Sequence, residues 1–142
     1  GLIDLTMLDQ EGYLAYFERA RQNDRLILKV PRRAFVDENG KPLRLNAGTA
    51  GRSGRRKLCI TDWDGDGKPD FLLNSANADF LQQVEQMSGF WVMKNAGTLA
   101  TRNIEGHDVS PTVVDFDGDV IPDFLGGAED GRFYFLKNPR AK

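Results

Sequence analysis

The chain has 142 residues, 40% of them hydrophobic, and its 19 Lys and Arg nearly balance 21 Asp and Glu, giving a formal net charge of −2. This balance gives no electrostatic reason to expect nucleic acid as a partner. No apolar run approaches the ~20 residues of a membrane span, and no signal peptide is recognisable.

Short apolar and aromatic runs, bounded by turn residues, predict β-strands along the whole chain. Dipeptides typical of hairpin turns, acidic-Gly, Asn-Gly and Ser-Gly, stand at residues 11–12, 39–40, 88–89 and 130–131. We expect ten strands. Three begin directly after Asp4, Asp70 and Asp123, and the other seven cover residues 13–17, 25–30, 57–60, 79–81, 90–94, 112–114 and 132–136.

The segment at residues 42–56, rich in Gly, Ala, Ser, Thr and Arg, predicts a long inserted loop. It ends in a cationic run, because Arg52, Arg55, Arg56 and Lys57 place four cations within six residues. This run is either a solvated turn that balances the neighbouring aspartates or a site for an anionic ligand.

Two nine-residue stretches, 62–70 and 115–123, place aspartate at positions 1, 3, 5 and 9 and glycine at position 4. Four carboxylates so close together repel one another unless a cation lies between them, and oxygen ligands in a flexible loop suit Ca²⁺. The sequence therefore predicts two calcium sites. The expected ligands are the carboxylates of Asp62, Asp64, Asp66 and Asp70 with the carbonyl of Lys68, and those of Asp115, Asp117, Asp119 and Asp123 with the carbonyl of Ile121.

An EF-hand does not fit these loops, because it requires flanking helices and a Glu at position 12. Position 12 is Leu73 in one loop and Gly126 in the other, and each loop has a proline at position 8, which disfavours a following helix. The alternative to a metal site is a pair of acidic surface turns. Trp63 and Phe116 share position 2 of the loops and are expected to share a packing role.

Position 6 separates the two loops, since it is Gly67 in the first and Val120 in the second. Glycine permits a sharp turn at this position. We therefore predict that the loop at 115–123 binds its cation more weakly than the loop at 62–70.

The acidic motif belongs to an internal repeat. Asp70 and Asp123 lie 53 residues apart, and residues 1–8 align with 67–74, which makes Asp4 the last ligand of a third, truncated site. Units of about four short antiparallel strands at this period describe β-propeller blades. The motif Asp-x-Asp-Gly-Asp-x-x-Pro-Asp-Phe-Leu, with a strand on either side, resembles the FG-GAP or VCBS repeats of integrin α-subunits and secreted bacterial proteins.

The resemblance implies a propeller of about seven blades, with calcium between the first and second strands of a blade. The chain is then an all-β fragment of a single propeller, and its partners are the remaining blades. It would hold the last three strands of one blade and a loop (1–50), a complete blade (51–103) and the first three strands of the next (104–142). Low-charge calcium sites work at extracellular concentrations, which favours an extracellular, cell-surface or periplasmic location.

A ligand site is expected where the inserted loop approaches the next blade. His107, the only histidine, stands as far before Asp115 as the cationic run stands before Asp62. We therefore expect Arg52, Arg55 and Arg56 to lie near His107. His107 is either a hydrogen-bonding loop residue or a general base, because its pKa lies near neutral pH. Arginines beside it would stabilise the enolate formed when a uronate loses its α-proton.

Three functions follow from these observations. The sequence favours a calcium-stabilised propeller module that binds glycan or protein ligands. The alternative is part of a carbohydrate-active enzyme, such as a polysaccharide lyase that acts on acidic sugars with His107 as the candidate catalytic residue. A purely structural repeat of a surface protein is the third possibility, because a fold does not by itself define a function.

Overall fold

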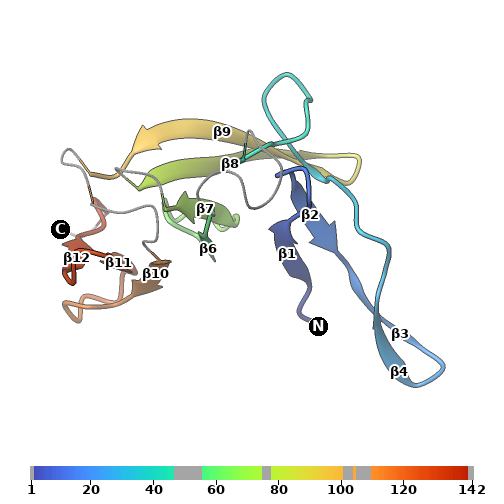
Figure 1. Ribbon diagram of the computed structural model, residues 1–142, viewed down its shortest axis with the longest axis horizontal. Helices are drawn as coiled ribbons and strands as arrows, with labels where there is room; N and C mark the ends of the chain where they lie inside the picture. The colour runs from blue at the N-terminus through green and yellow to red at the C-terminus, as the bar shows by residue number, and fades with distance from the viewer. Residues whose placement is uncertain (1, 47–55, 75–77, 101–103, 105–109, 141–142) are drawn as a thin grey trace. The chain divides into compact units, whose positions relative to one another are not determined.

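The computed structural model describes residues 2–46, 56–74, 78–100, 104 and 110–140. Within these ranges the chain is all-β, with twelve strands, no helix and no sheet closed into a barrel. The strands form sheets in the orders β1-β2, β3-β4, β5-β9-β8-β7-β6 and β10-β11-β12 (Figure 1). The prediction of an all-β fold is thus confirmed at this level.

Two compact units divide the chain. The first contains Gly1–Ser53 and Val84–Val92, and the second contains Gly54–Gln83 and Met93–Lys142. The long hairpin of β8 (Asp79–Met87) and β9 (Phe90–Thr98) supplies residues to both. Its two-residue turn has positive φ at Ser88 (46°) and Gly89 (85°), which matches the twist of the two strands.

The first unit contains β1 (Leu5–Leu8), β2 (Leu14–Phe17), β3 (Arg19–Gln22), β4 (Arg25–Leu28) and β5 (Phe35–Val36). Its buried centre includes an aromatic cluster, in which the ring of Trp91 lies 4.8 Å from Tyr16 and 5.0 Å from Phe35. The Arg32 guanidinium lies over Tyr16 and Trp91 and donates to the carbonyl of Gly89. Cation–π contacts of this kind hold the hairpin tip against β2.

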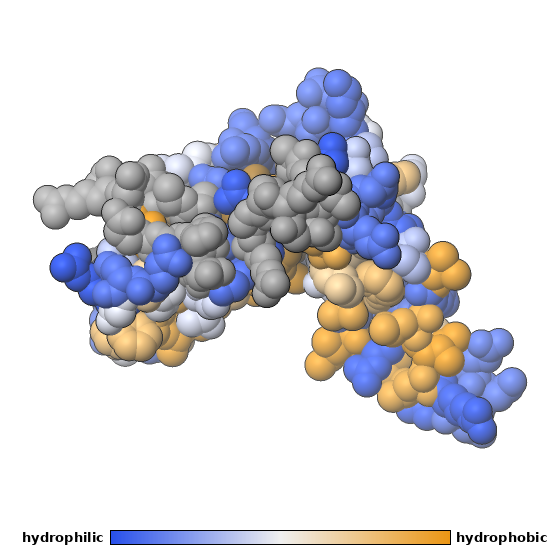
Figure 2. Space-filling model, in the orientation of Figure 1, coloured by the Kyte–Doolittle hydropathy of each residue, from blue (hydrophilic) through white to orange (hydrophobic). Residues whose placement is uncertain are grey.

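Apolar side chains on β1 and β4 of the first unit are exposed to solvent. Leu5, Met7, Leu26 and Leu28 have exposed fractions of 42% to 50%. Figure 2 shows this hydrophobic area beside the hydrophilic β3–β4 turn. These strands therefore contribute little of their apolar surface to the core of the described residues.

The second unit contains β6 (Leu58–Thr61), β7 (Asp70–Leu73), β10 (Ser110–Val114), β11 (Asp123–Gly127) and β12 (Phe133–Leu136). Neighbouring strands pair in antiparallel register, with Thr61 opposite Asp70 and Val114 opposite Asp123. Each acidic loop thus connects two paired strands and closes on the first residue of the second strand. The core of this unit is formed by Trp63, Leu72, Ala78, Ala100, Ile104 and Phe124.

The predicted strands are found, and two others are added. β3 carries the polar sequence Arg-Ala-Arg-Gln, and it forms a strand because Asn23 and Asp24 adopt positive φ values of 47° and 59° and turn it onto β4. β5 has two residues and pairs in parallel with β9. β3 has no apolar pattern, and β5 is too short to show one, so the periodicity did not indicate them.

Candidate metal centres

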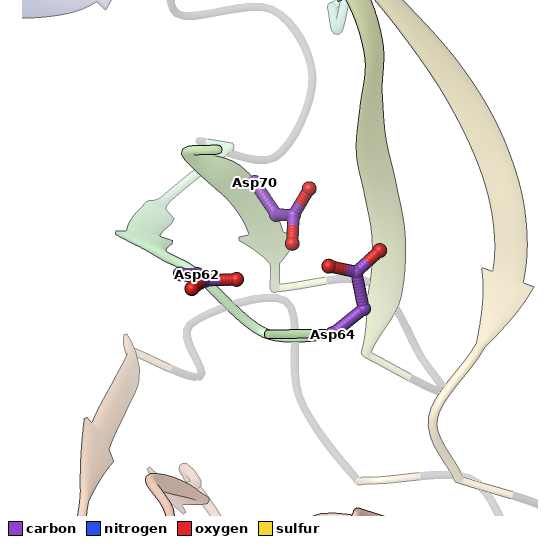
Figure 3. Close-up of side chains that lie close together, drawn as sticks. All are labelled: Asp62, Asp64 and Asp70. Carbon is purple, nitrogen blue, oxygen red and sulfur yellow. The ribbon is translucent and has the colours of Figure 1, made fainter. Parts of the chain in front are cut away.

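The first acidic loop joins β6 to β7. Single carboxylate oxygens of Asp62, Asp64 and Asp70 all lie within 4.8 Å of one another, which could hold a metal ion. Figure 3 shows the three side chains converging from the loop and from the start of β7. All three offer oxygen, the donor that hard cations prefer.

The loop is wound around its own aspartates. The Asp62 carboxylate accepts the N–H of Gly65 at 2.8 Å through Oδ1 and that of Gly67 at 3.1 Å through Oδ2. Asp64 accepts the N–H of Asp66 at 3.1 Å. Gly65 and Gly67 have φ near +80°, a conformation that costs glycine little. The spacing of Asp and Gly therefore determines the loop conformation.

Asp70 lies at the bottom of the loop and is completely buried. Its carboxylate accepts the N–H of Trp63 at 3.0 Å and that of Gln83 at 2.9 Å. Burial raises the pKa of this carboxyl, although the two N–H donors and a further backbone bond act in the opposite direction. A cation between Asp70 and its neighbours would offset the cost of keeping this charge buried.

The second loop joins β10 to β11 and repeats this arrangement. Asp115, Asp117 and Asp123 offer carboxylate oxygens within 4.8 Å of one another. Asp115 accepts the N–H of Gly118 at 2.8 Å and that of Val120 at 3.1 Å. Buried Asp123 accepts from Phe116 at 3.3 Å and from Asn138 at 2.8 Å. Both predicted loops therefore bring positions 1, 3 and 9 together.

The aspartate at position 5 belongs to neither triad in the part of the chain that the structure describes. Asp66 pairs with the Lys68 ammonium at 2.6 Å, which holds the pKa of that carboxyl below its usual value. Asp119 Oδ2 lies 3.3 Å from Lys137 Nζ, but this contact lacks hydrogen-bond geometry. The buried Asp119 oxygen thus has no hydrogen-bond donor among the described residues, which is compatible with a cation ligand.

Position 2 does not have one packing role, so that prediction is wrong. Trp63 is 3% exposed and belongs to the core of the second unit, whereas Phe116 is 60% exposed and its ring lies 5.0 Å from Phe135. Lys68 and Ile121, whose carbonyls are the predicted ligands at position 7, each donate their backbone N–H to the aspartate at position 5. Position 6 is left-handed in both loops, with φ of 84° at Gly67 and 70° at Val120.

Sequence reasoning missed a segment after β12 that touches both loops. Asn138 is completely buried, and its side-chain amide donates to the carbonyls of Trp63 and Pro122, each at 3.0 Å. Arg140 donates to the carbonyl of Asp62 at 3.0 Å. An asparagine near the end of a strand gives no local sign of burial, so only the pairing of the strands reveals this link.

The Asp4 carboxylate has hydrogen-bond partners placed like those of Asp70 and Asp123. Its carboxylate accepts the N–H of Arg19 at 2.7 Å, fifteen residues on, as Asp123 accepts that of Asn138. The Tyr16 hydroxyl donates to its other oxygen at 2.5 Å, in the place that a loop N–H takes at Asp70 and Asp123. No companion acidic residues group with Asp4 among the described residues.

The predicted ligand site cannot be placed in the same way. Arg52, Arg55 and His107 lie outside the described residues. Arg56 is half-buried just before β6. The anion site and the candidate general base therefore stay predictions.

Comparisons with known proteins do not assign the chain to a family. A scan against protein-family models, a search of curated proteins and a search of solved structures give no significant match. In the described parts of the chain, no helix meets the length and apolarity needed to cross a bilayer.

Proposed function

We propose that the chain is a calcium-binding β-repeat module of the FG-GAP or VCBS type, and that its acidic loops are structural calcium sites. The observation that carries this proposal is the repetition of one triad, with the same loop hydrogen bonds, in residues 62–70 and 115–123. Like charges repel, so three carboxylates converging in each of two loops favour a cation between them.

The donor set favours calcium over other metals. Both triads consist of carboxylates alone, whereas Zn²⁺ sites typically include His or Cys. Mg²⁺ demands near-ideal octahedral geometry and keeps several waters, while Ca²⁺ accepts 6 to 8 oxygens in a flexible shell. The Asp66 and Asp119 carboxylates and the carbonyls of Lys68 and Ile121 are the further oxygens that the loops offer.

The propeller part of the proposal is supported by three copies of one local unit. Asp4, Asp70 and Asp123 each precede or begin a strand that pairs with the following strand. In the first and third copies the pairing register is identical, with Leu5 opposite Phe17 and Phe124 opposite Leu136. Exposed apolar side chains on β1 and β4 would be covered by further blades of the same ring.

The module is proposed to act outside the cytoplasm as a binding platform for glycan or protein ligands. Calcium sites of extracellular modules work at concentrations on the order of 10⁻⁴ to 10⁻³ M. In this role calcium stabilises the blades, and the predicted insertion at residues 42–56 would supply recognition.

Thermal unfolding in CaCl₂, in MgCl₂ and in EDTA tests the calcium sites. We expect CaCl₂ at about one hundred times the dissociation constant to add about 2.7 kcal/mol per site to the free energy of unfolding. Asp64→Asn and Asp117→Asn should each remove the calcium-dependent stabilisation of one site. A melting temperature that is the same in all three solutions would overturn the proposal.

A further inference from the structure

The second loop contains a cation supplied by the protein itself. Lys137 follows β12, and its Nζ lies 2.5 Å from Asp117 Oδ2 and 3.3 Å from Asp119 Oδ2. Asp117 is a member of the metal-binding triad. A metal ion in this loop would therefore meet an ammonium group on one of its own ligands.

The first loop has an uncharged group at the equivalent place. Leu136 pairs with Phe124, the residue after Asp123, and Leu81 pairs with Phe71, the residue after Asp70. The next residues, Lys137 and Gln82, are therefore equivalent. The Gln82 amide donates to Asp64 Oδ2 at 2.6 Å, and Asp64 and Asp117 share position 3 of their loops.

The first loop also has an ammonium group, but that group touches a different carboxylate. Lys68 pairs with Asp66 at 2.6 Å, and Asp66 lies outside the triad of the first loop in the described residues. The two loops therefore differ at the aspartate in loop position 3, which contacts a positive charge in the second loop and a neutral amide in the first.

We infer that Lys137 is an intramolecular competitor for the cation of the second loop, so that the two sites differ in affinity and the first fills before the second. This inference rests on the proposed calcium sites. The Lys137 side chain is 45% exposed and has a flexible four-carbon stem, so it can leave Asp117 for solvent. It lowers the affinity of the site without blocking it, and it does so independently of Val120.

A calorimetric titration with CaCl₂ tests the inference on one loop at a time. Asp64→Asn isolates the second loop, and Asp117→Asn isolates the first. In the Asp64→Asn background, Lys137→Gln should raise the calcium affinity of the second loop about tenfold, because a like charge no longer opposes the ion. Lys137→Arg keeps the charge and should leave the affinity low. In the Asp117→Asn background, Gln82→Lys should lower the calcium affinity of the first loop by a similar factor.

A control separates competition at the loop from a change in net charge. Lys94, in β9, is exposed, and Lys94→Gln removes the same charge from the second unit. Lys137→Gln must therefore exceed Lys94→Gln in its effect on affinity, and circular dichroism in EDTA checks that each variant is folded. Equal effects of the two variants, with two calcium ions bound by the wild type, would overturn the inference alone. Absence of calcium binding by the wild type would overturn the proposed function and this inference together.

Discussion

The two acidic loops have the same internal hydrogen bonds and different surroundings. In both, the aspartate at position 1 accepts the N–H groups of positions 4 and 6. The first loop buries Trp63 in the core and has Gly67 at its left-handed position 6. The second exposes Phe116 and has Val120 there. The comparison teaches that Asp and Gly spacing determines the conformation of the loop, while packing determines how much the loop contributes to stability.

The largest expected difference is at position 2. Trp63→Ala should lower the free energy of unfolding by about 3–5 kcal/mol, because it leaves a cavity in the core. Phe116→Ala should cost less than about 1 kcal/mol, because the ring is largely exposed. Urea denaturation in EDTA measures both changes. Equal losses would show that the two loops are anchored alike.

The buried aspartates at position 9 come next. Asp70→Ala leaves two buried N–H groups without an acceptor and should cost about 2–4 kcal/mol. Asp123→Ala should cost about 1 kcal/mol less, because one of its two bonds, from Phe116, is 3.3 Å long and only partly buried. Denaturation in EDTA again removes the contribution of any metal. A larger loss for Asp123→Ala would reverse this ranking.

At position 6 of the loops, valine and glycine can be exchanged in both directions. Val120→Gly should raise the free energy of unfolding by about 1 kcal/mol, since relief of the left-handed strain exceeds the entropy cost of glycine. Val120 is 87% exposed, so little packing is lost. Gly67→Val should be destabilising by a similar amount. Thermal melts of the pair test this exchange, and stabilisation by Gly67→Val would contradict it.

The smallest expected effect concerns Asp4. The N–H of Arg19 and the Tyr16 hydroxyl hold the pKa of Asp4 below 3.8 in the folded chain. The hydrogen bond to Asp4 raises the pKa of Tyr16 to about 12. Asp4 therefore stabilises the fold above about pH 4, and this contribution is lost as pH falls through its lowered pKa.

Asp4→Asn tests this titration. The variant should be less stable than the wild type at pH 6, and the difference should shrink as the pH is lowered from 4 to 2. Urea midpoints at several pH values measure it. A difference that is constant over this range would mean that the ionised carboxylate is not the cause.

Local sequence was sufficient for the features that depend on neighbouring residues. The Asp-Gly spacing predicted both triads, and Gly12 and Gly131 marked hairpin turns that the structure contains. It was not sufficient where partners are distant along the chain. The burial of Asn138 depends on carbonyls at Trp63 and Pro122, and the pairing of β5 depends on β9.

The same limit explains what was missed within the loops. Position 2 looks equivalent in sequence, because Trp63 and Phe116 are both aromatic. Their burial differs because the core of the second unit surrounds only the first. Lys137 likewise follows an ordinary strand, and only the pairing of β12 with β11 places it at the second loop.

Anomalous diffraction from crystals of the full chain grown in CaCl₂ tests the central claim most directly. The account predicts two calcium peaks, one within about 2.3–2.6 Å of carboxylate oxygens of Asp62, Asp64 and Asp70, and one at the same distance from Asp115, Asp117 and Asp123. At limiting calcium, the first peak should be the stronger. Ordered triads without anomalous density at saturating calcium would contradict the claim that these loops are calcium sites.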